Sequence, residues 1–319
     1  MSTAARLIGL DWGTSSMRAY LYDADGKVVA TRHQPWGIRN LPEGGFAGAL
    51  RAITADWPAC VAVAAGMVGS RQGWREVPYV ALPADAASIA HGMLRVDDCS
   101  SHALWIAPGL QRHQPADVMR GEETQIIGAL AQQPLYQANS RFVLPGTHSK
   151  WASVVDGRIV AFDTVMTGEM YALLIKHSIL GAGLPGEPAQ PFAHDAFSRG
   201  VLTAKESGAE GVFSRLFSTR ALMLAGELAA AHVPDFLSGL LIGEEFRIAR
   251  SRDDDGISPL CLIGEASLCQ RYTLAARSFG YAAPTVIDDA AVQGLWQLAS
   301  AAGLLAKARL HSFSGATTP

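Results

Sequence analysis

The sequence predicts an α/β protein that is built from two domains of related fold. The chain has 319 residues, and at roughly 150 residues per domain this length suits about two buried cores. Hydrophobic residues make up 49% of the chain and charged residues only 17%, a balance that favours a compact enzyme over a disordered protein. A pattern of three strands separated by two turns also occurs twice, near residue 6 and again near residue 141. Such a repeat is typical of a duplicated domain.

The first copy of the pattern lies at the start of the chain. Residues 6–10 form a short apolar run, and residues 17–22 form a second run after a turn rich in Gly, Thr and Ser. Asp23, Asp25 and Gly26 then predict a tight hairpin turn, because these residue types tolerate the backbone conformations of such turns. A third strand is expected over residues 27–31. The start of the chain therefore predicts a meander of three strands.

The second copy starts at an apolar run over residues 141–144. Residues 145–149 form the turn, and residues 151–155 predict the next strand. Asp156 and Gly157 predict a hairpin turn before a third strand over residues 158–164. Two unrelated hairpins could share this pattern by chance, and the sequence alone leaves that alternative open.

Helices and further strands complete each half. Residues 47–55 have helical spacing, and residues 61–67 predict a strand that runs into a Gly-rich loop. A helix is predicted over residues 122–132, because apolar side chains recur on one face and two acids occupy the first turn. The pattern after residue 170 is mostly helical, followed by a strand over 260–263, a helix over 266–279 and a last helix from residue 289. We expect two domains, over residues 1–135 and 136–319. The last helix could also return to pack on the first domain, and the sequence leaves this alternative open.

Charge and cysteine content exclude several classes of function. The net charge is -3, so the chain lacks the basic excess that binding to a nucleic-acid backbone needs. We find no signal peptide and no stretch long and apolar enough for a membrane span. The four cysteines form no CxxC pair, which favours a reducing, cytoplasmic setting; they are Cys60, Cys99, Cys261 and Cys269. We therefore expect no nucleic-acid or membrane partner.

The turn between the first two strands has the composition of a phosphate-binding loop. Gly13 lets the backbone approach an anion closely, while Thr14 and Ser15 add hydroxyl donors. Asp11 at the edge of the turn is a carboxylate that can hold a hydrated Mg²⁺. Arg18 follows on the second strand as a further candidate for phosphate binding. The alternative is an ordinary hairpin with an exposed polar turn.

The turn at residues 145–150 repeats this composition in the second half of the chain. Its candidate phosphate-binding residues are Gly146, Thr147, His148, Ser149 and Lys150. Two such turns, one in each half, favour phosphate binding over two ordinary hairpins.

These two turns resemble the phosphate loops of the sugar kinase and actin superfamily. In order and spacing, seven segments across nearly the whole chain resemble the 2-dehydro-3-deoxygalactonokinase family. The segments are VAVAAGMVGS (61–70), WIAPGL (105–110), VMRGEETQ (118–125), LPGTHSKW (144–151), VMTGE (165–169), GAGLP (181–185) and FLSGLLIG (236–243).

The resemblance implies a fold, an activity and small-molecule partners. The fold is a pair of ribonuclease-H-like domains, the actin-like ATPase arrangement, with ATP in the cleft between them. The activity is ATP-dependent phosphorylation of the 6-hydroxyl of 2-dehydro-3-deoxy-D-galactonate in galactonate catabolism, with Mg²⁺ as cofactor. Another sugar acid or a polyol as substrate stays open, as does a homodimer. A nucleotide-dependent regulatory ATPase is the alternative from a different class, although the chain has no room for a peptide-binding or DNA-binding appendage.

The resemblance also points to a general base. In related carbohydrate kinases an Asp preceded by Gly, and followed six residues later by another Gly, opens a helix before the second phosphate turn. Gly121, Glu122 and Gly128 have this spacing, so Glu122 is the expected base, with the adjacent Glu123 as the alternative. A carboxylate in the first turn of a helix is held ionised by the N–H groups there, which suits a proton acceptor. Two helix-terminal charges without a catalytic role would look the same in the sequence.

Candidate residues for the sugar acid follow a predicted strand end, where α/β proteins bind ligands. They are Ser70, Gln72 and Trp74, although a plain connecting loop is equally consistent with this segment. A substrate carboxylate calls for a guanidinium donor. The first candidate is Arg120, and further candidates are Arg39 and Arg71.

The resemblance assigns adenosine contacts to the start of the helix expected over residues 266–279. The corresponding residues are Gly264, Glu265 and Ser267. The superfamily commonly has adjacent glycines in this segment, and Glu265 replaces one of them here. This departure leaves the details of nucleoside contact open.

Overall fold

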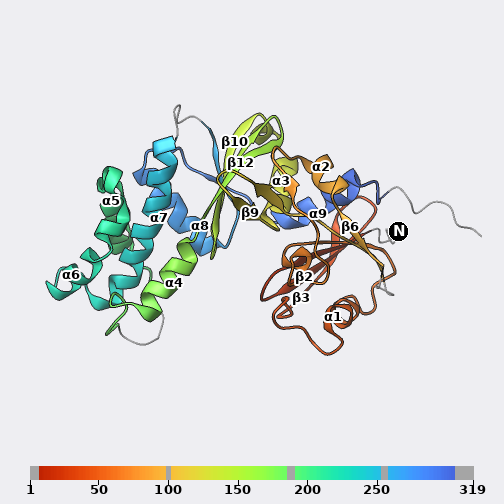
Figure 1. Cartoon of the computed structure of the whole chain (residues 1–319), viewed down its shortest axis with the longest axis horizontal. Helices are drawn as coiled ribbons and strands as arrows, with labels where there is room; N and C mark the ends of the chain where they lie inside the picture. The colour runs from red at the N-terminus through yellow and green to blue at the C-terminus, as the bar shows by residue number, and fades with distance from the viewer. Residues whose placement is uncertain (1–6, 98–101, 185–190, 253–257, 306–319) are drawn as a thin grey trace, which may run out of the picture. The chain divides into compact units, whose positions relative to one another are not determined.

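The chain forms two compact units in the computed structural model, which describes residues 7–97, 102–184, 191–252 and 258–305 (Figure 1). The first unit comprises Met1–Leu135, Gly157–Val160 and Asp289–Pro319, and the second comprises Tyr136–Asp156 and Ala161–Asp288. The second domain is therefore not the continuous range 136–319 that the sequence analysis expected, because the chain returns to the first unit at Asp289. Cys99 and Pro185 lie outside the described residues.

The first unit is built on a six-stranded mixed sheet with the strand order β3-β2-β1-β4-β7-β6. Strands β1 and β2, and β2 and β3, are antiparallel, whereas β1 runs parallel to β4 and β4 parallel to β7. Strands β5, β8 and β9 form a separate small sheet. The elements are β1 (Leu7–Trp12), β2 (Met17–Tyr22), β3 (Val28–Gln34), α1 (Gly45–Ile53), β4 (Val61–Ala65), β5 (Val80–Ala81), α2 (Ala86–His91), β6 (Leu94–Val96), β7 (Ala103–Ile106), β8 (Leu110–Arg112), β9 (Asp117–Met119), α3 (Glu122–Gln132) and α9 (Ala290–Ala301).

The second unit is built on a five-stranded sheet with the order β12-β11-β10-β13-β14. Strand β10 is antiparallel to β11 and parallel to β13, which is parallel to β14. The elements are β10 (Asn139–Leu144), β11 (Ser149–Val155), β12 (Arg158–Val165), α4 (Thr167–His177), α5 (His194–Glu206), α6 (Ser218–Leu224), α7 (Val233–Arg252), β13 (Leu260–Leu262), α8 (Ala266–Ser278) and β14 (Thr285–Val286).

The two sheets repeat one topology. In each, the first strand lies in the middle, antiparallel to the second strand on one side and parallel to the fourth on the other. The third strand follows the second at one edge. The hairpin before β12 turns at Asp156 and Gly157, whose φ angles of 50° and 71° are those of a tight left-handed turn. The repeated sequence pattern is therefore a repeated sheet topology rather than two unrelated hairpins.

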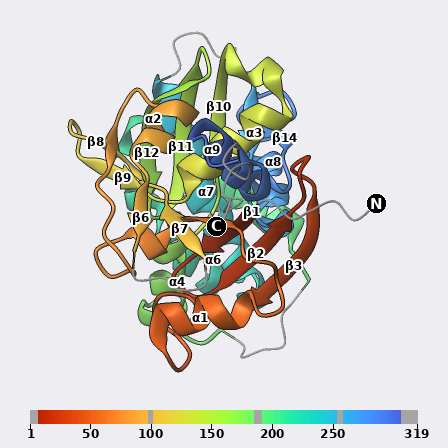
Figure 2. The ribbon, with the colours of Figure 1, turned by 90° about the vertical axis from the view of Figure 1, so that its right-hand side faces the viewer.

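The core of the first unit forms around the central strand β1. Ile8, Leu10 and Trp12 are fully buried in one cluster with apolar side chains of β2, β4 and α1. Burial of each large apolar side chain contributes about 1.5–3 kcal/mol. Figure 2 shows β1, β2 and β3 side by side. The core therefore fixes the end of β1, where the candidate phosphate turn begins.

Helix α9 belongs to the first unit because it packs on α3 (Figures 1 and 2). The two helices approach so closely that a Cβ at Gly128 would lie 1.9 Å from the Ala290 carbonyl oxygen, and one at Gly294 would lie 1.9 Å from the Thr124 carbonyl oxygen. The Tyr22 hydroxyl of β2 donates a hydrogen bond of 2.8 Å to the Val292 carbonyl of α9. Gly128, singled out by its spacing from Glu122, therefore serves helix packing.

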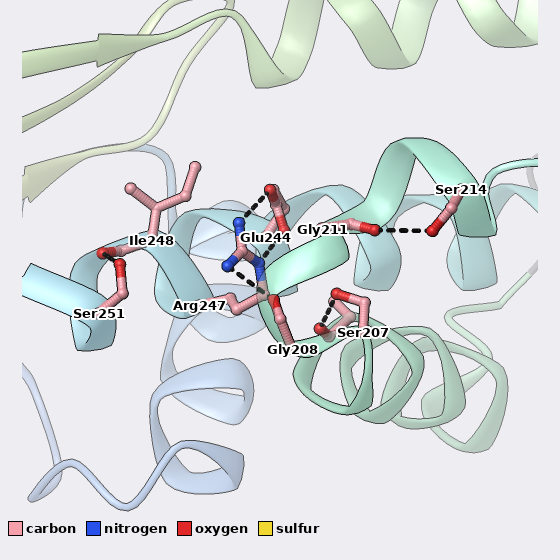
Figure 3. Close-up of polar contacts among 9 residues, drawn as sticks. Ser207, Gly208, Gly211, Ser214, Glu244, Arg247, Ile248 and Ser251 are labelled. Carbon is pink, nitrogen blue, oxygen red and sulfur yellow. Dashed lines mark hydrogen bonds and ion pairs between the residues drawn. The ribbon is translucent and has the colours of Figure 1, made fainter.

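In the second unit, α7 packs on α5 and on the turn that follows α5. A Cβ at Gly239 of α7 would lie 2.0 Å from the Phe197 carbonyl oxygen of α5. Arg247 donates hydrogen bonds to the Glu244 carboxylate one turn earlier, at 2.6 and 2.8 Å. Figure 3 shows this pair on α7. Arg247 also donates to the Gly208 carbonyl at 2.9 Å. These contacts hold the middle of α7 against its neighbours.

Within the described ranges, no helix combines the length and the apolar character that crossing a membrane requires.

The close helix contact predicts a large cost for Gly128→Ala. The added methyl group would meet backbone rather than a movable side chain, so α3 and α9 must separate. We expect the free energy of unfolding to fall by about 2 kcal/mol or more, measured by urea denaturation. Ser300→Ala, on an exposed position of α9, is the control and should change stability by less than about 0.5 kcal/mol. Equal stability of the two variants would contradict the contact.

Candidate functional site

The turn between β1 and β2 is held by the segment that follows β3. The carbonyls of Gly13 and Thr14 accept hydrogen bonds from the backbone N–H groups of Ile38 and Arg39, at 3.1 and 3.3 Å. The side chain of Thr14 is half-buried, and Ser15 at the tip is exposed. The carbonyls of this turn therefore point into the protein, and hydroxyl-bearing residues lie at its surface.

Asp11 and Arg18 face each other across the first two strands at the base of this turn. Burial raises the pKa of the Asp11 carboxyl, the Arg18 guanidinium opposes this rise, and the charge of Glu122 adds to it. The described residues contain no group of three or more His, Cys, Asp or Glu side chains that could hold a metal ion alone. A single carboxylate still suits Mg²⁺, which usually keeps several waters and binds nucleotide phosphates at the same time. Asp11 thus fits a magnesium ion that arrives with its nucleotide.

Two glycines bring α3 close to the ends of β1 and β4. Gly66 has a φ angle of 98°, and a Cβ there would lie 2.8 Å from the Trp12 carbonyl oxygen. Gly121 has a φ angle of 108°, and a Cβ there would lie 3.3 Å from Gly66 Cα. Both positions need a residue that lacks a Cβ and accepts positive φ. As a result the first turn of α3 lies beside Asp11.

The structure distinguishes the two adjacent acids of α3. Glu123 is fully buried, and both of its carboxylate oxygens accept hydrogen bonds from the Gly121 N–H at 2.9 and 2.8 Å. Burial raises its pKa to about 7. Glu122 is half-buried and accepts a hydrogen bond of 3.0 Å from the Arg120 N–H. Glu123 therefore caps the helix, whereas Glu122 is the acid that lies beside Asp11.

Of the residues predicted to bind the sugar acid, Trp74 has a structural role. Its ring stacks on Phe46 with 5.8 Å between centroids and meets Trp12 edge to face at 6.1 Å. The half-buried Trp74 therefore packs against the core beneath the first turn, and its contact with the substrate stays a prediction. Gln72 is exposed and stays a prediction.

Ser70 and Arg120 are both buried and lie on neighbouring segments. They are 7% and 9% exposed, and a Cβ at Gly69 would lie 2.9 Å from the Arg120 Nη1. The other two arginine candidates, Arg39 and Arg71, are exposed. The structure thus favours Arg120 among the three as a residue of an enclosed site.

The turn between β10 and β11 lies against the first turn of α4. A Cβ at Gly168 would lie 2.5 Å from the Gly146 carbonyl oxygen, and the Glu169 N–H donates to the Thr147 carbonyl at 3.0 Å. His148 Nε2 lies 2.5 Å from the Glu169 carboxylate. A Cβ on Gly146 would meet nothing within 4 Å, so the backbone of this turn is open on that side.

Ser149 and Lys150 are not in this turn but in β11, and both are buried. The Ser149 hydroxyl donates a hydrogen bond of 2.9 Å to Glu245, and Lys150 Nζ donates to the His148 carbonyl at 3.4 Å. A buried carboxylate thus already accepts the proton of the Ser149 hydroxyl, and phosphate binding by this residue stays a prediction.

Glu245 is a buried site residue that the sequence analysis missed. It is 1% exposed and accepts hydrogen bonds from Trp151 Nε1 at 2.6 Å, from the Tyr272 hydroxyl at 2.6 Å and from the Thr167 hydroxyl, besides Ser149. Burial raises the pKa of its carboxyl, and the four donors oppose this rise. The only signal in the sequence is its position between Leu241 and Ala249 on the apolar face of α7.

A cavity of about 170 Å³ opens beside the β10–β11 turn. Gly146 and Thr167 line it on one side, and Leu268 and Arg271 of α8 on another. The Arg271 guanidinium pairs with Asp235 at 2.7 Å. The cavity is thus a mixed apolar and polar pocket next to one predicted phosphate turn.

The segment expected to contact adenosine lies at the start of α8, near the same turn. A Cβ at Gly264 would lie 3.3 Å from Pro145 Cδ. Glu265 is the N-cap of α8 and accepts hydrogen bonds from the Ser267 and Leu268 N–H groups at 3.0 and 3.2 Å, and from the Ser267 hydroxyl. These bonds lower the pKa of Glu265. Glu265 and Ser267 therefore cap the helix, Gly264 lies beside the β10–β11 turn, and the adenosine contacts of these residues stay a prediction.

Comparison with known proteins identifies the chain. The family model of 2-keto-3-deoxy-galactonokinases matches residues 11–298. The 2-dehydro-3-deoxygalactonokinase of Escherichia coli K12 is 39% identical over 294 residues, which cover 91% of this chain and 95% of that protein. A relative from Rhizobium meliloti, assigned as the same enzyme, is 38% identical over 97% of this chain and 98% of its own length.

A crystal structure gives the same result. The structure of a Sinorhizobium meliloti protein, assigned as a 2-dehydro-3-deoxygalactonokinase, has a TM-score of 0.85 with this chain at 35% identity, and covers 92% of this chain and 98% of its own. The comparisons place the chain among the carbohydrate kinases. It belongs to the 2-keto-3-deoxy-galactonokinase family, which confirms the resemblance seen in the sequence.

The buried Glu123 predicts a specific pH dependence of stability. Burial raises its pKa to about 7 in the folded protein, above the ordinary value of 4.5. Between these values the folded state holds a proton that the unfolded state has lost, so this group lowers stability as the pH rises from about 4.5 to 7. Glu123→Gln removes the titration. We expect the difference between the melting temperatures of the variant and the wild type to shift in favour of the variant as the pH rises through this range. Above about pH 7 this difference should level off.

Glu206→Gln, on an exposed position of α5, is the control and should follow the wild-type pH profile. A Glu123→Gln profile that also runs parallel to the wild type would contradict the buried, protonated carboxyl.

Proposed function

We propose that this protein transfers the γ-phosphoryl group of ATP to the 6-hydroxyl of 2-dehydro-3-deoxygalactonate. Membership of the family and the name of the Escherichia coli relative support the substrate. The observation that carries the proposal is the position of Glu122 beside Asp11, at the base of a turn with hydroxyl side chains. Phosphoryl transfer needs such an arrangement, because its catalysis rests mainly on positioning and on stabilisation of charge.

Glu122 is the proposed general base. Its carboxylate accepts the proton of the 6-hydroxyl while the hydroxyl oxygen forms a bond to the γ-phosphorus of ATP. The bond from that phosphorus to the β,γ-bridging oxygen breaks, and ADP leaves with the electron pair. Glu123 suits this role less well, since its carboxylate is fully buried and accepts hydrogen bonds from the N–H of Gly121.

The remaining residues of the first unit hold the phosphates and the cation. We assign the phosphates to Gly13, Thr14, Ser15 and Arg18, and the magnesium ion to Asp11 through water. When bound, Mg²⁺ neutralises charge on the phosphates. Burial raises the pKa of the Asp11 carboxyl, and the charge of Arg18 opposes this rise and so favours the ionised form that cation binding requires.

The second unit supplies the other half of the nucleotide site in this proposal. Gly146, Thr147 and His148 bind the phosphates, and the nucleoside occupies the cavity between this turn and α8, with Gly264 at its edge. Both units then have the ribonuclease-H-like fold of the actin-like ATPases, and both contribute residues that bind ATP. The repeated strand order supports this assignment. The reaction would take place in the cytoplasm.

The direct test is ADP release in the presence of a panel of sugar acids and polyols. Stimulation by 2-dehydro-3-deoxygalactonate well above the other compounds supports the proposal. Stimulation by a different compound keeps the kinase chemistry and changes the substrate. Basal ATP hydrolysis that no compound stimulates would indicate a regulatory ATPase.

Glu122→Gln tests the general base. The amide is close in size but cannot accept the proton, so kcat should fall by about 10²- to 10⁴-fold while the KM for ATP stays nearly constant. The control is again Glu206→Gln. Full activity of Glu122→Gln would move the role to another acid.

Asp11→Asn tests the magnesium site. Without the carboxylate the ion is held by nucleotide phosphates alone, so we expect kcat to fall by about 10²-fold and the Mg²⁺ concentration for half-maximal rate to rise. An unchanged Mg²⁺ dependence would show that Asp11 does not contact the hydrated ion.

A further inference from the structure

The guanidinium of Arg120 is buried without a full set of partners. Its Nη2 donates to the Val77 carbonyl at 2.8 Å, and its carbon lies 4.3 Å from the ring centre of Tyr79. Among the described residues, Nε and Nη1 have no hydrogen-bond partner. The nearby Glu122 carboxylate accepts from the backbone N–H of Arg120 instead. A buried cation is thus anchored at one end and has unused donors.

Ser70 presents a third unused donor on the adjacent segment. Its hydroxyl is buried and also has no partner among the described residues. Arg120 Nη1 lies on this side, since a Cβ at Gly69 would be 2.9 Å from it. A larger residue at position 69 would therefore fill the space next to Nη1. The glycine before Ser70 lets the guanidinium approach this loop.

Unused buried donors of this kind call for an acceptor with negative charge. Each unsatisfied buried donor costs about 1–3 kcal/mol, and more when the group is charged. An anion restores the hydrogen bonds and neutralises the guanidinium, and a carboxylate has two oxygens that can accept from two donors at once. The phosphates of ATP are assigned to the β1–β2 and β10–β11 turns, which are separate from this site. The carboxylate of the substrate is therefore the anion that remains for Arg120 and Ser70.

We propose that Arg120 Nη1 and the Ser70 hydroxyl bind the carboxylate of the substrate, and that this contact makes the enzyme select sugar acids over neutral sugars. The inference rests on the proposed function and adds the group that reads the acid end of the substrate. Arg120 precedes Glu122 by two residues, so one short segment holds the carboxylate and the base that acts on the hydroxyl. Rejection of a neutral sugar follows, because it would leave the buried guanidinium unpaired.

The test compares 2-dehydro-3-deoxygalactonate with its primary carboxamide, which has nearly the same shape but no charge. The wild type should use the acid with a kcat/KM about 10²-fold or more above that of the amide. Arg120→Gln should lose about 10- to 10²-fold in kcat/KM for the acid, mostly through KM, and change less than about threefold for the amide. Ser70→Ala should shift the acid in the same direction by a smaller factor. Arg95→Gln, an exposed arginine of the first unit, should change neither.

Three results would overturn the inference. Equal kcat/KM for acid and amide in the wild type would show that the enzyme does not recognise the carboxylate. This result does not depend on the folding of any variant. Equal losses of acid and amide in both Arg120→Gln and Ser70→Ala would show that these residues only support the fold. A wild type inactive on both compounds, yet active on a neutral polyol, would remove the proposed substrate and this inference together. A melting temperature for each variant separates loss of folding from loss of binding.

Discussion

The chemistry of the first unit depends on the close approach of three backbone segments. The ends of β1 and β4 and the start of α3 meet at Gly66 and Gly121, where a Cβ would press against the Trp12 carbonyl or the neighbouring glycine. Any other residue would push α3 away from the sheet and would strain the positive φ angle. This contact places Asp11 and Glu122 in one partly buried site. The charge of Glu122 there adds to the rise that burial causes in the pKa of Asp11.

A buried carboxylate has the corresponding structural role in the second unit. Glu245 accepts hydrogen bonds from Ser149, Trp151, Thr167 and Tyr272, which come from β11, α4 and α8. Four donors compensate for much of the free-energy cost of burying one carboxylate. Removal of a donor would lose part of this compensation and would destabilise the fold. The network therefore joins β11 to helices α4, α7 and α8 beside the β10–β11 turn and the neighbouring cavity.

Local sequence patterns predicted most of the fold, because those patterns have local physical causes. Helix α3 has the predicted bounds, since Gly121 and Pro134 bracket it, and the Asp-Gly turn before β12 was predicted from residue types that tolerate left-handed backbone. Strands β5, β8 and β9 were missed because segments of two or three residues show no periodicity. The place of α9 was left open because its contact with α3 depends on two glycines far apart in the sequence.

The site was predictable as a set of segments but not as a set of side-chain roles. Glu122 and Glu123 look alike in the sequence, and only burial separates the fully buried Glu123 from the half-buried Glu122. Trp74 and Ser149 have residue types suited to ligand binding, yet an aromatic cluster and a distant carboxylate use their side chains. These partners lie many positions away in the chain, so a local sequence pattern cannot predict them.

We propose that both turns bind the phosphates of one ATP while Glu122 faces the reacting hydroxyl. A crystal structure of the protein with a non-hydrolysable ATP analogue, Mg²⁺ and 2-dehydro-3-deoxygalactonate tests it most directly. The account predicts phosphate oxygens on the β1–β2 and β10–β11 turns, and the 6-hydroxyl within hydrogen-bond distance of Glu122. Phosphates bound to one turn alone, or a sugar hydroxyl held by a different acid, would contradict it.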